Sequence, residues 1–251
     1  MKTAAYVDYL VAWLENQRTE LYGMDGYTLG VSGGIDSAVC LHLLARTNAP
    51  IQALVLPAAV SSQEDVNDAQ AVLKSAGVSG QIISIAPWYD LIMAQLQPAL
   101  YAEPERVNVL KGNLMARLRM IALFTTAQSH RSIVLGTDNA AEILTGYFTK
   151  FGDGAADVLP LAELRKEQVF ELGRYLGVPK SVLEKKPSAG LWEGQTDEGE
   201  MGVTYAEIDA YLRGEPVSEQ ALKQIQFWHN RSHHKRMSPP KPMGLDEFKG
   251  K

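Results

Sequence analysis

The chain of 251 residues contains a single cysteine, Cys40, so no disulfide can form within it. A cysteine-poor composition fits a reducing compartment, and we expect a cytoplasmic protein. No run of about 18 apolar residues occurs anywhere, and the N-terminal segment has no continuous apolar stretch of the kind that a signal peptide carries. These absences argue against a disulfide-stabilised secreted scaffold and against a membrane protein.

The chain also lacks an excess of basic residues. Lys and Arg number 24 against 29 Asp and Glu, which gives a formal net charge of −5 and argues against a general nucleic-acid binder. Internal repeats and low-complexity segments are absent as well. We therefore expect one α/β domain over residues 1–251, with a mobile lid at about 185–202, where glycines and charges concentrate, and a flexible C-terminal tail.

Two common phosphate-binding patterns, G-x-x-x-x-G-K-[ST] and G-x-G-x-x-G, are missing, but residues 27–38 predict a different phosphate site. This segment reads as a strand, a Ser/Gly turn and the start of a helix. Gly33 and Gly34 let the backbone approach an anion, and the N–H groups of the helix start point at it. Asp36 would repel a bare phosphate, so we expect a bridging cation, most simply Mg²⁺. The segment therefore predicts a pyrophosphate cradle.

Apolar strands alternate with amphipathic helices along the first two thirds of the chain. Strands are predicted at 27–31, 51–56, 81–85 and 132–135, and helices at 6–14, 38–44, 62–76, 113–128 and 165–176. This alternation predicts an α/β fold, a parallel sheet with helices on both faces. Because ligands bind at the carboxyl ends of such strands, the loops at 31–34 and 135–138 should meet at one site.

Two motifs connect the chain to a known family. The pattern S-G-G-x-D-S at 32–37 resembles the pyrophosphate-binding loop of the ATP pyrophosphatase superfamily, whose members cleave ATP between the α- and β-phosphates. The segments 113–120 and 136–168, above all G-Y-F-T-K at 146–150, resemble the NAD synthetase family, and the likeness extends to residues 234–236. It implies an adenine-nucleotide α-hydrolase-like fold. It also implies amidation of nicotinic acid adenine dinucleotide (deamido-NAD) to NAD through an adenylate, with ATP as co-substrate and release of AMP and pyrophosphate.

The resemblance assigns roles position by position. It implies Asp36 and Glu142 as Mg²⁺ ligands, and Asp36, Lys166 and Asp157 as the groups that take part in the chemistry, with Asp157 a candidate for positioning ammonia. The implied ATP-binding residues are Gly30, Val31, Ser32, Gly33, Gly34, Ile35, Asp36, Ser37, Thr137, Lys166 and Ser188. The implied deamido-NAD-binding residues are Arg117, Lys150, Asp157, His234 and Lys235.

The nitrogen source follows from the cysteine count. A fused glutaminase needs a nucleophilic cysteine and many more residues, whereas Cys40 directly follows the predicted cradle. We expect free ammonia as the substrate and no separate glutaminase subunit, and the resemblance implies a homodimer. One departure from the family pattern stands in the lid, where Gly190 replaces an aspartate; Glu193 or Asp197 could supply the missing carboxylate.

Other interpretations stay open. The chain could be another adenylating pyrophosphatase, of the GMP or asparagine synthetase type, or a sensor that binds ATP without turning it over. The turn 152–154 could be a plain acidic turn or the start of a calcium loop, but it lacks the alternating acidic residues and the terminal glutamate of an EF-hand, so calcium is not expected. His229 and His233 have the spacing of a metal pair on one helix, but no Cys, Asp or Glu lies near them in the sequence, so a zinc site is not expected.

Overall fold

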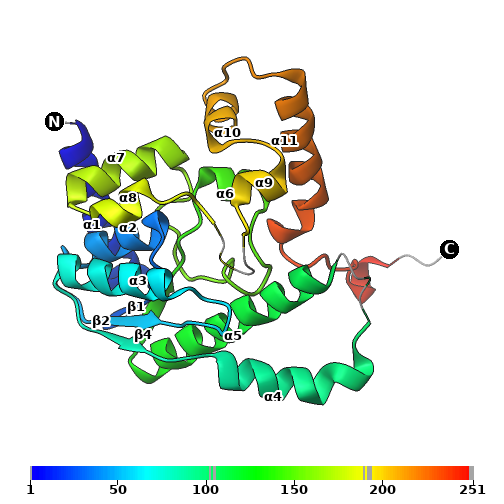
Figure 1. Cartoon of the computed structure of the whole chain (residues 1–251), viewed down its shortest axis with the longest axis horizontal. Coiled ribbons are helices and arrows are strands. Elements are labelled where there is room, and N and C mark those ends of the chain that lie inside the picture. Colours follow the sequence, from blue (N-terminus) through cyan, green and yellow to red (C-terminus); the bar gives the residue numbers. More distant parts are fainter. Residues whose placement is uncertain (1, 102, 104–105, 189, 191–193, 249–251) are drawn as a thin grey trace.

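Four short parallel strands form the central sheet of the protein, for which a computed structural model describes residues 2–101, 103, 106–188, 190 and 194–248 (Figure 1). They are β1 (Gly26–Gly30), β2 (Ile51–Val55), β3 (Gly80–Ile82) and β4 (Ser132–Leu135), in the order β3-β2-β1-β4. The predicted α/β fold is confirmed. The predicted bounds differ from these by no more than three residues, the largest difference being the end of β3.

The strand order creates a topological switch next to β1. From β1 the chain proceeds outward to β2 and β3, and it then returns to place β4 on the other side of β1. Leu29 of β1 is therefore in register with Leu135 of β4, while Gly30 pairs with Leu54 of β2. Connections leave the two sides of β1 in opposite directions, which opens a crevice at the carboxyl ends of β1 and β4.

Helices cover both faces of the sheet (Figure 1). One face carries α1 (Lys2–Asn16), α2 (Ile35–Leu44), α3 (Gln63–Ala76) and α7 (Lys166–Leu176), with α8 (Lys180–Glu184) beside α2 and α7. The other face carries α5 (Val107–Ser129), against which α4 (Ala86–Leu96) packs. Because α2 lies between the sheet and the outer helices, Cys40 is fully buried, as expected for a small core residue.

A second group of helices packs beyond the sheet, around its own apolar cluster. It consists of α6 (Ala140–Thr145), α9 (Asp197–Met201), α10 (Tyr205–Leu212) and α11 (Glu219–Arg231), and Met201, Ile208 and Ile225 are almost fully buried between them. Asp209 of α10 joins this group to α7, since its carboxylate accepts hydrogen bonds from the N–H groups of Lys166 (3.1 Å) and Glu167 (2.8 Å). Asp209 thereby fixes the point at which α7 begins.

Several features differ from the sequence-based expectations. The helix expected at 113–128 begins earlier, at Val107, and α4 and α10 were not predicted. His229 and His233 do not share a helix, because α11 ends at Arg231; His229 Nδ1 instead lies 2.9 Å from the carbonyl oxygen of Leu144. Within the described ranges, no helix is both long and apolar enough to cross a membrane.

The turn before α2 supplies a test of this architecture. Gly33 has a φ of +84°, and a Cβ placed on it would lie 2.5 Å from the carbonyl oxygen of Asp65. We predict that Gly33→Ala lowers the free energy of unfolding by about 2 kcal/mol or more, because it adds a steric clash to an unfavourable backbone conformation. Urea denaturation measures this change.

Gly34→Ala is the matched control. Gly34 has a φ of −89°, and a Cβ there would meet only the hydroxyl of Ser32, at 3.4 Å. The control should stay within about 0.5 kcal/mol of the parent protein. Equal stabilities of the two variants would contradict the described turn.

Candidate active site at the carboxyl ends of β1 and β4

The loop between β1 and α2 has the form of an anion cradle. Ser37 Oγ accepts a hydrogen bond from the N–H of Ser32 (3.2 Å), and Ser32 Oγ accepts one from the N–H of Gly34 (3.2 Å). The two hydroxyls are 3.1 Å apart, so they hold the turn in shape. No side chain of the described residues caps the first turn of α2, which leaves N–H groups and the positive end of the helix dipole for an anion.

Lys166, the first residue of α7, extends into the crevice between two carboxylates. Its Nζ lies 2.6 Å from Asp36 Oδ2 and 3.5 Å from Glu142 Oε1. The Lys166 side chain is only 4% exposed, and those of Asp36 and Glu142 are 17% and 15% exposed. The structure thus brings together three predicted site residues that come from three different helices.

Asn139 orients both carboxylates. Its side-chain amide donates to Asp36 Oδ1 (2.9 Å), and its backbone N–H donates to Glu142 Oε2 (3.0 Å). Each carboxylate therefore uses one oxygen for Asn139 and presents the other to Lys166. The hydroxyl of Tyr205 adds a further contact, 3.2 Å from Glu142 Oε1 and 2.9 Å from Asp197 Oδ2, and the ring of Tyr205 lies 4.7 Å from Lys166 Nζ.

Burial and charge perturb these groups strongly. Burial raises the pKa of Glu142 to about 7; Lys166 opposes this rise, and Asp36 adds to it. For Lys166, burial by itself lowers the pKa, but Asp36 and Glu142 more than compensate and raise it above its ordinary value. Burial and the charge of Glu142 also raise the pKa of Asp138, which is 6% exposed. Acidic groups outnumber basic ones here, an environment that favours a bound cation.

The donor set fits Mg²⁺. Asp36 and Glu142 offer oxygen ligands, whereas no group of three or more His, Cys, Asp and Glu side chains arranged for a metal is found among the described residues. Mg²⁺ commonly takes one or two protein carboxylates and completes its coordination with water and substrate phosphates. A cation held only by Asp36 and Glu142 would follow that pattern.

A second group of predicted residues converges beside α5. Arg117 donates to the carbonyl oxygen of Lys150 (3.3 Å), and Lys150 Nζ donates to the carbonyl oxygen of His234 (2.6 Å). Lys235 Nζ donates to the carbonyl oxygens of Gly146, at 2.7 Å, and Phe148. These contacts join the four residues that were predicted, together with Asp157, to bind the dinucleotide.

Asp157 lies apart from that group. Its carboxylate accepts a hydrogen bond from the N–H of Val134 (2.7 Å), and its own N–H donates to the Val134 carbonyl (2.9 Å). Its carbonyl oxygen accepts from the hydroxyl of Tyr22 (2.9 Å). The Asp157 side chain thus holds the chain against the edge of β4, which gives it a structural role; its use in positioning ammonia stays a prediction.

Sequence reasoning missed Asp153 and Asp138. Asp153 Oδ1 accepts from the N–H of Thr149 (3.0 Å), and Thr149 Oγ1 donates to Asn113 Oδ1 (2.7 Å), so Asp153 sits at the junction of the α5 contacts. The sequence did hold a signal that could have singled out Asp153: this residue stands between two glycines inside the most family-specific segment of the chain. Asp138 directly follows Thr137, which lies, partly buried, in the loop after β4.

The first residue of the segment predicted to be a lid, Lys185, lies against α3. Lys185 Nζ pairs with Asp65 (2.7 Å) and Asp68 (2.8 Å) of α3. Ser188 Oγ donates to the carbonyl oxygen of Gln195 (2.8 Å). Glu193 lies outside the described residues, while the Asp197 carboxylate accepts a hydrogen bond from the hydroxyl of Tyr205, whose ring lies beside Lys166. Movement of this segment stays a prediction.

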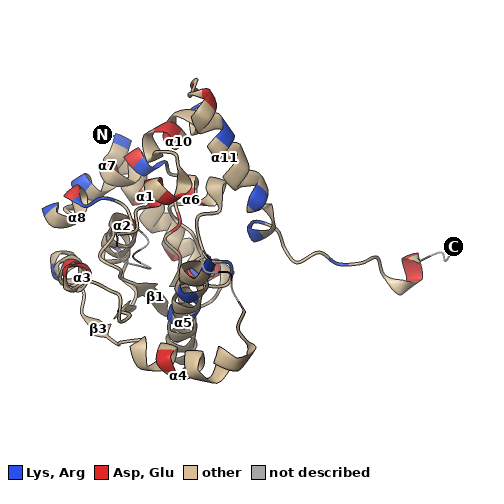
Figure 2. Cartoon of the chain, turned by 45° about the vertical axis from the view of Figure 1, so that its right-hand side comes forward, with Lys and Arg blue, Asp and Glu red and all other residues tan. Residues whose placement is uncertain are grey.

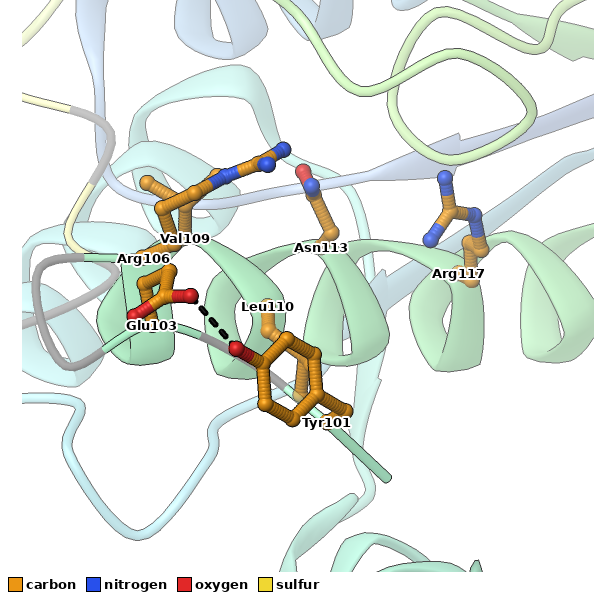
Figure 3. A pocket seen from close by; sticks show the side chains of 7 residues that line it. All are labelled: Tyr101, Glu103, Arg106, Val109, Leu110, Asn113 and Arg117. Atoms are coloured by element: carbon orange, nitrogen blue, oxygen red, sulfur yellow. Dashed lines mark hydrogen bonds between the residues drawn. The ribbon is translucent and has the colours of Figure 1, made fainter. Parts of the chain in front are cut away.

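A cavity of about 310 Å³ opens along α5 (Figure 3). Figure 3 shows that Arg106, Asn113 and Arg117 extend from the same side of the helix, while Tyr101 and Glu103 are joined by a 2.5 Å hydrogen bond. The lining residues are Tyr101, Glu103, Arg106, Val109, Leu110, Asn113 and Arg117. Because Asn113 contacts Thr149 and Arg117 contacts Lys150, one end of the cavity adjoins the loop that carries Asp153.

The fold and the site together define a class. A parallel α/β sheet with an S-G-G-x-D-S cradle at its switch point, and with two carboxylates and a lysine facing that cradle, belongs to the adenine-nucleotide α-hydrolase-like proteins of the ATP pyrophosphatase type.

Comparison with known proteins gives the family. Residues 6–239 match the family model described as NAD synthase, and the chain belongs to this family. A relative from Mannheimia succiniciproducens, named "NH(3)-dependent NAD(+) synthetase", is 85% identical over 98% of this chain and 99% of its own. Among solved structures, an NMN synthetase from Francisella tularensis is 50% identical with a TM-score of 0.91, covering 96% of this chain and 99% of its own. An NAD+ synthetase from Burkholderia pseudomallei is 31% identical with a TM-score of 0.76, covering 95% and 91%.

The position of Lys166 generates a prediction about metal binding. Its ammonium group occupies the space between the two carboxylates that suit a divalent cation, so lysine and metal should compete there when no nucleotide is bound. We predict that Lys166→Gln binds Mn²⁺ at least tenfold more tightly than the parent protein without ATP. Electron paramagnetic resonance of free Mn²⁺ measures this directly.

Arg165→Gln is the control for this experiment. The neighbouring Arg165 pairs with Glu167 at the surface (3.0 Å), so its loss removes the same charge without freeing the two carboxylates. The control should bind Mn²⁺ like the parent protein. Identical Mn²⁺ affinities for all three proteins would show that Lys166 does not compete with the metal.

Proposed function

We propose that the protein catalyses the ATP-dependent amidation of nicotinic acid adenine dinucleotide by free ammonia, with formation of NAD, AMP and pyrophosphate. The observation that carries this proposal is Lys166 held between Asp36 and Glu142 beside the S-G-G-x-D-S cradle. Membership of the NAD synthase family and the 85% identical relative named as an ammonia-dependent synthetase support it.

The first step activates a carboxylate. A carboxylate is a poor acyl donor to ammonia, so an oxygen of the pyridine carboxylate attacks the α-phosphorus of ATP and the bond from that phosphorus to the bridging oxygen breaks. Pyrophosphate leaves, and an acyl-adenylate forms. The N–H groups at the start of α2 and the ammonium group of Lys166 offset the negative charge of the leaving group, within a crevice where water screens little.

Mg²⁺ would be held by Asp36 and Glu142 through the oxygens that contact Lys166 in this structure. A bound Mg²⁺ neutralises charge on the triphosphate. Lys166 must then leave the two carboxylates, and the triphosphate is the nearest strong partner for its charge. We assign Lys166 to the phosphates on this ground.

The second step is attack of ammonia on the acyl carbon, which expels AMP. The only cysteine is buried in α2, so this chain supplies no glutaminase nucleophile of its own and free ammonia is the nitrogen source. Asp157 stays the candidate that the family resemblance implies for positioning the incoming amine, and Asp153, beside Thr149 and Asn113, is a second candidate carboxylate.

We also propose a homodimer formed through α4 and α5, in the cytoplasm. These helices leave large apolar side chains exposed, including Leu91 (63%), Ile121 (52%) and Leu96 (44%). An apolar face of this kind on two adjacent helices is typical of a subunit interface. The reducing compartment agrees with the single unpaired cysteine.

One solved relative favours a second candidate substrate. The 50% identical structure is named an NMN synthetase, and it resembles this chain more closely than the Burkholderia NAD+ synthetase does, in sequence and in fold. The corresponding reaction would amidate nicotinic acid mononucleotide. The same cradle, carboxylates and lysine would serve it.

The reaction is tested by product identification. We predict that ATP, Mg²⁺, nicotinic acid adenine dinucleotide and ammonium yield NAD, AMP and pyrophosphate, whereas glutamine in place of ammonium yields none. Asp36→Asn should lower the rate at least a hundredfold, roughly the loss of a metal-ligand contribution of several kcal/mol, while the exposed Asp8→Asn in α1 should not change it. Production of ADP would contradict the assignment, and binding of ATP without turnover would favour a sensor.

The molar mass of the protein in solution tests the proposed interface. We predict that Leu91→Glu converts a dimer into a monomer in light scattering after gel filtration, because a charge would be buried at the centre of the α4–α5 face. Leu245→Glu is the matched control, since Leu245 is 87% exposed in the C-terminal segment, which extends away from the body of the molecule (Figure 2). A monomeric parent protein, or a dimer that survives Leu91→Glu, would overturn this interface.

A further inference from the structure

We propose that Phe151 binds the adenine ring of the dinucleotide by stacking and thereby contributes to the selection of this substrate. The inference rests on the proposed amidation reaction and adds a binding residue that the family resemblance does not imply. Three observations carry it: the unusual backbone conformation of Phe151, the exposure of its side chain, and the cationic side chains beside it.

The backbone of Phe151 is the first argument. The N–H of Gly152 donates to the carbonyl oxygen of Thr149 (2.9 Å), which closes a tight turn with Phe151 as its third residue. Phe151 has a φ of +61° there. Glycine or asparagine usually fills such a position, because a bulky side chain in the left-handed region costs stability. The turn by itself therefore does not call for a phenylalanine.

The side chain of Phe151 is the second argument, and Arg131 provides the comparison. Arg131 is the other non-glycine residue of the described chain with a positive φ, +49°. Its guanidinium pairs with Asp25 (3.0 Å) and donates to the carbonyl oxygen of Gly23 (3.3 Å), so side-chain contacts offset the cost of its conformation. Phe151, by contrast, is 59% exposed and joins none of the apolar clusters that the described residues form. Packing within the chain does not account for Phe151, whereas a ligand would.

Two cationic side chains lie beside the ring. Lys150 Nζ lies over it, 5.2 Å from its centroid, where a cation is attracted to an aromatic face. Arg117 donates to the carbonyl oxygen of Lys150 (3.3 Å), directly before Phe151. Neither cation forms an ion pair with an acidic side chain in the part of the chain that the structure describes. In the dinucleotide, one ribose separates the adenine from the diphosphate, so cations for the diphosphate and a ring for the base should be neighbours.

The exposure of Phe151 decides between the two bases of the substrate. The pyridine carboxylate has to reach the cradle, where the side chains of Lys166 and Glu142 are only 4% and 15% exposed. A residue that is 59% exposed does not belong to that enclosed end. With the pyridine held inside, the adenine is the base that extends outward. Stacking on an aromatic side chain strengthens the binding of a base by roughly fivefold to a hundredfold.

Steady-state kinetics at saturating ATP, Mg²⁺ and ammonium measure this contribution. We expect Phe151→Leu to raise KM for the dinucleotide about fivefold or more and to keep kcat within about twofold, because adenine stacks equally in the ground state and in the transition state. Phe151→Tyr keeps the ring and should keep KM. An unchanged KM in Phe151→Leu, or a rise in KM for ATP instead, overturns the inference and leaves the amidation intact. A parent enzyme that does not amidate the dinucleotide overturns the proposed function itself.

A matched pair of variants separates binding from stability. Phe151→Gly and Phe151→Leu both lose the ring, but glycine adopts the left-handed conformation without strain. The glycine variant should therefore unfold at a higher urea concentration than the leucine variant, while both show the same raised KM. Arg131→Gly, which changes the other strained position, should keep the KM of the parent enzyme. Equal urea midpoints for the pair, or KM values that follow stability, would overturn the inference.

ADP-ribose tests which base the ring contacts. It contains the adenosine, the diphosphate and the second ribose of the dinucleotide, but it lacks the pyridine. We expect it to compete with the dinucleotide, and its inhibition constant should rise in Phe151→Leu by the same factor as KM, about fivefold or more. Lack of competition in the parent enzyme, or an inhibition constant that Phe151→Leu leaves unchanged, would overturn the assignment of Phe151 to the adenine.

Discussion

The contact between Lys166 and the carboxylates of Asp36 and Glu142 is the interaction on which the site depends. All three groups are largely removed from water, and removing one partner from such an ion pair leaves a buried charge that destabilises a protein by on the order of 3–5 kcal/mol. The arrangement is stable only as long as the positive charge stays. A nucleotide with its cation can therefore replace Lys166 between the carboxylates, whereas an uncharged ligand cannot.

The second group of helices, α6, α9, α10 and α11, holds that contact in place. Glu142 comes from α6 and Tyr205 from α10, while Asp209 of α10 binds the first N–H groups of α7 and thereby fixes Lys166. Asp36 comes from the opposite side, at the start of α2 on the sheet. The site is thus a junction between two apolar clusters, and its geometry changes if either cluster shifts.

The cavity along α5 is chemically different from this junction. The junction is acidic and suits a cation, whereas the cavity carries Arg106 and Arg117 and suits an anion. In a chain with a net charge of −5, the two places offer an anion different partners: helix N–H groups at the cradle and guanidinium groups in the cavity.

The sequence by itself determined the α/β fold and placed the S-G-G-x-D-S motif after its first strand, because strand periodicity and this pattern act over a few neighbouring residues. The roles of Asp36 and Glu142 as metal ligands stay predictions. The sequence also indicated that the loops after β1 and β4 meet, which Asn139 and Asp36 confirm by direct contact. Only the tertiary structure decided that Asp157 binds β4, that Asp153 joins the α5 contacts, and that Arg106 lines a cavity. The reason is physical: a carboxylate has the same sequence signature whether it accepts a backbone N–H or faces a substrate, and only the partners that packing brings to it distinguish the two roles.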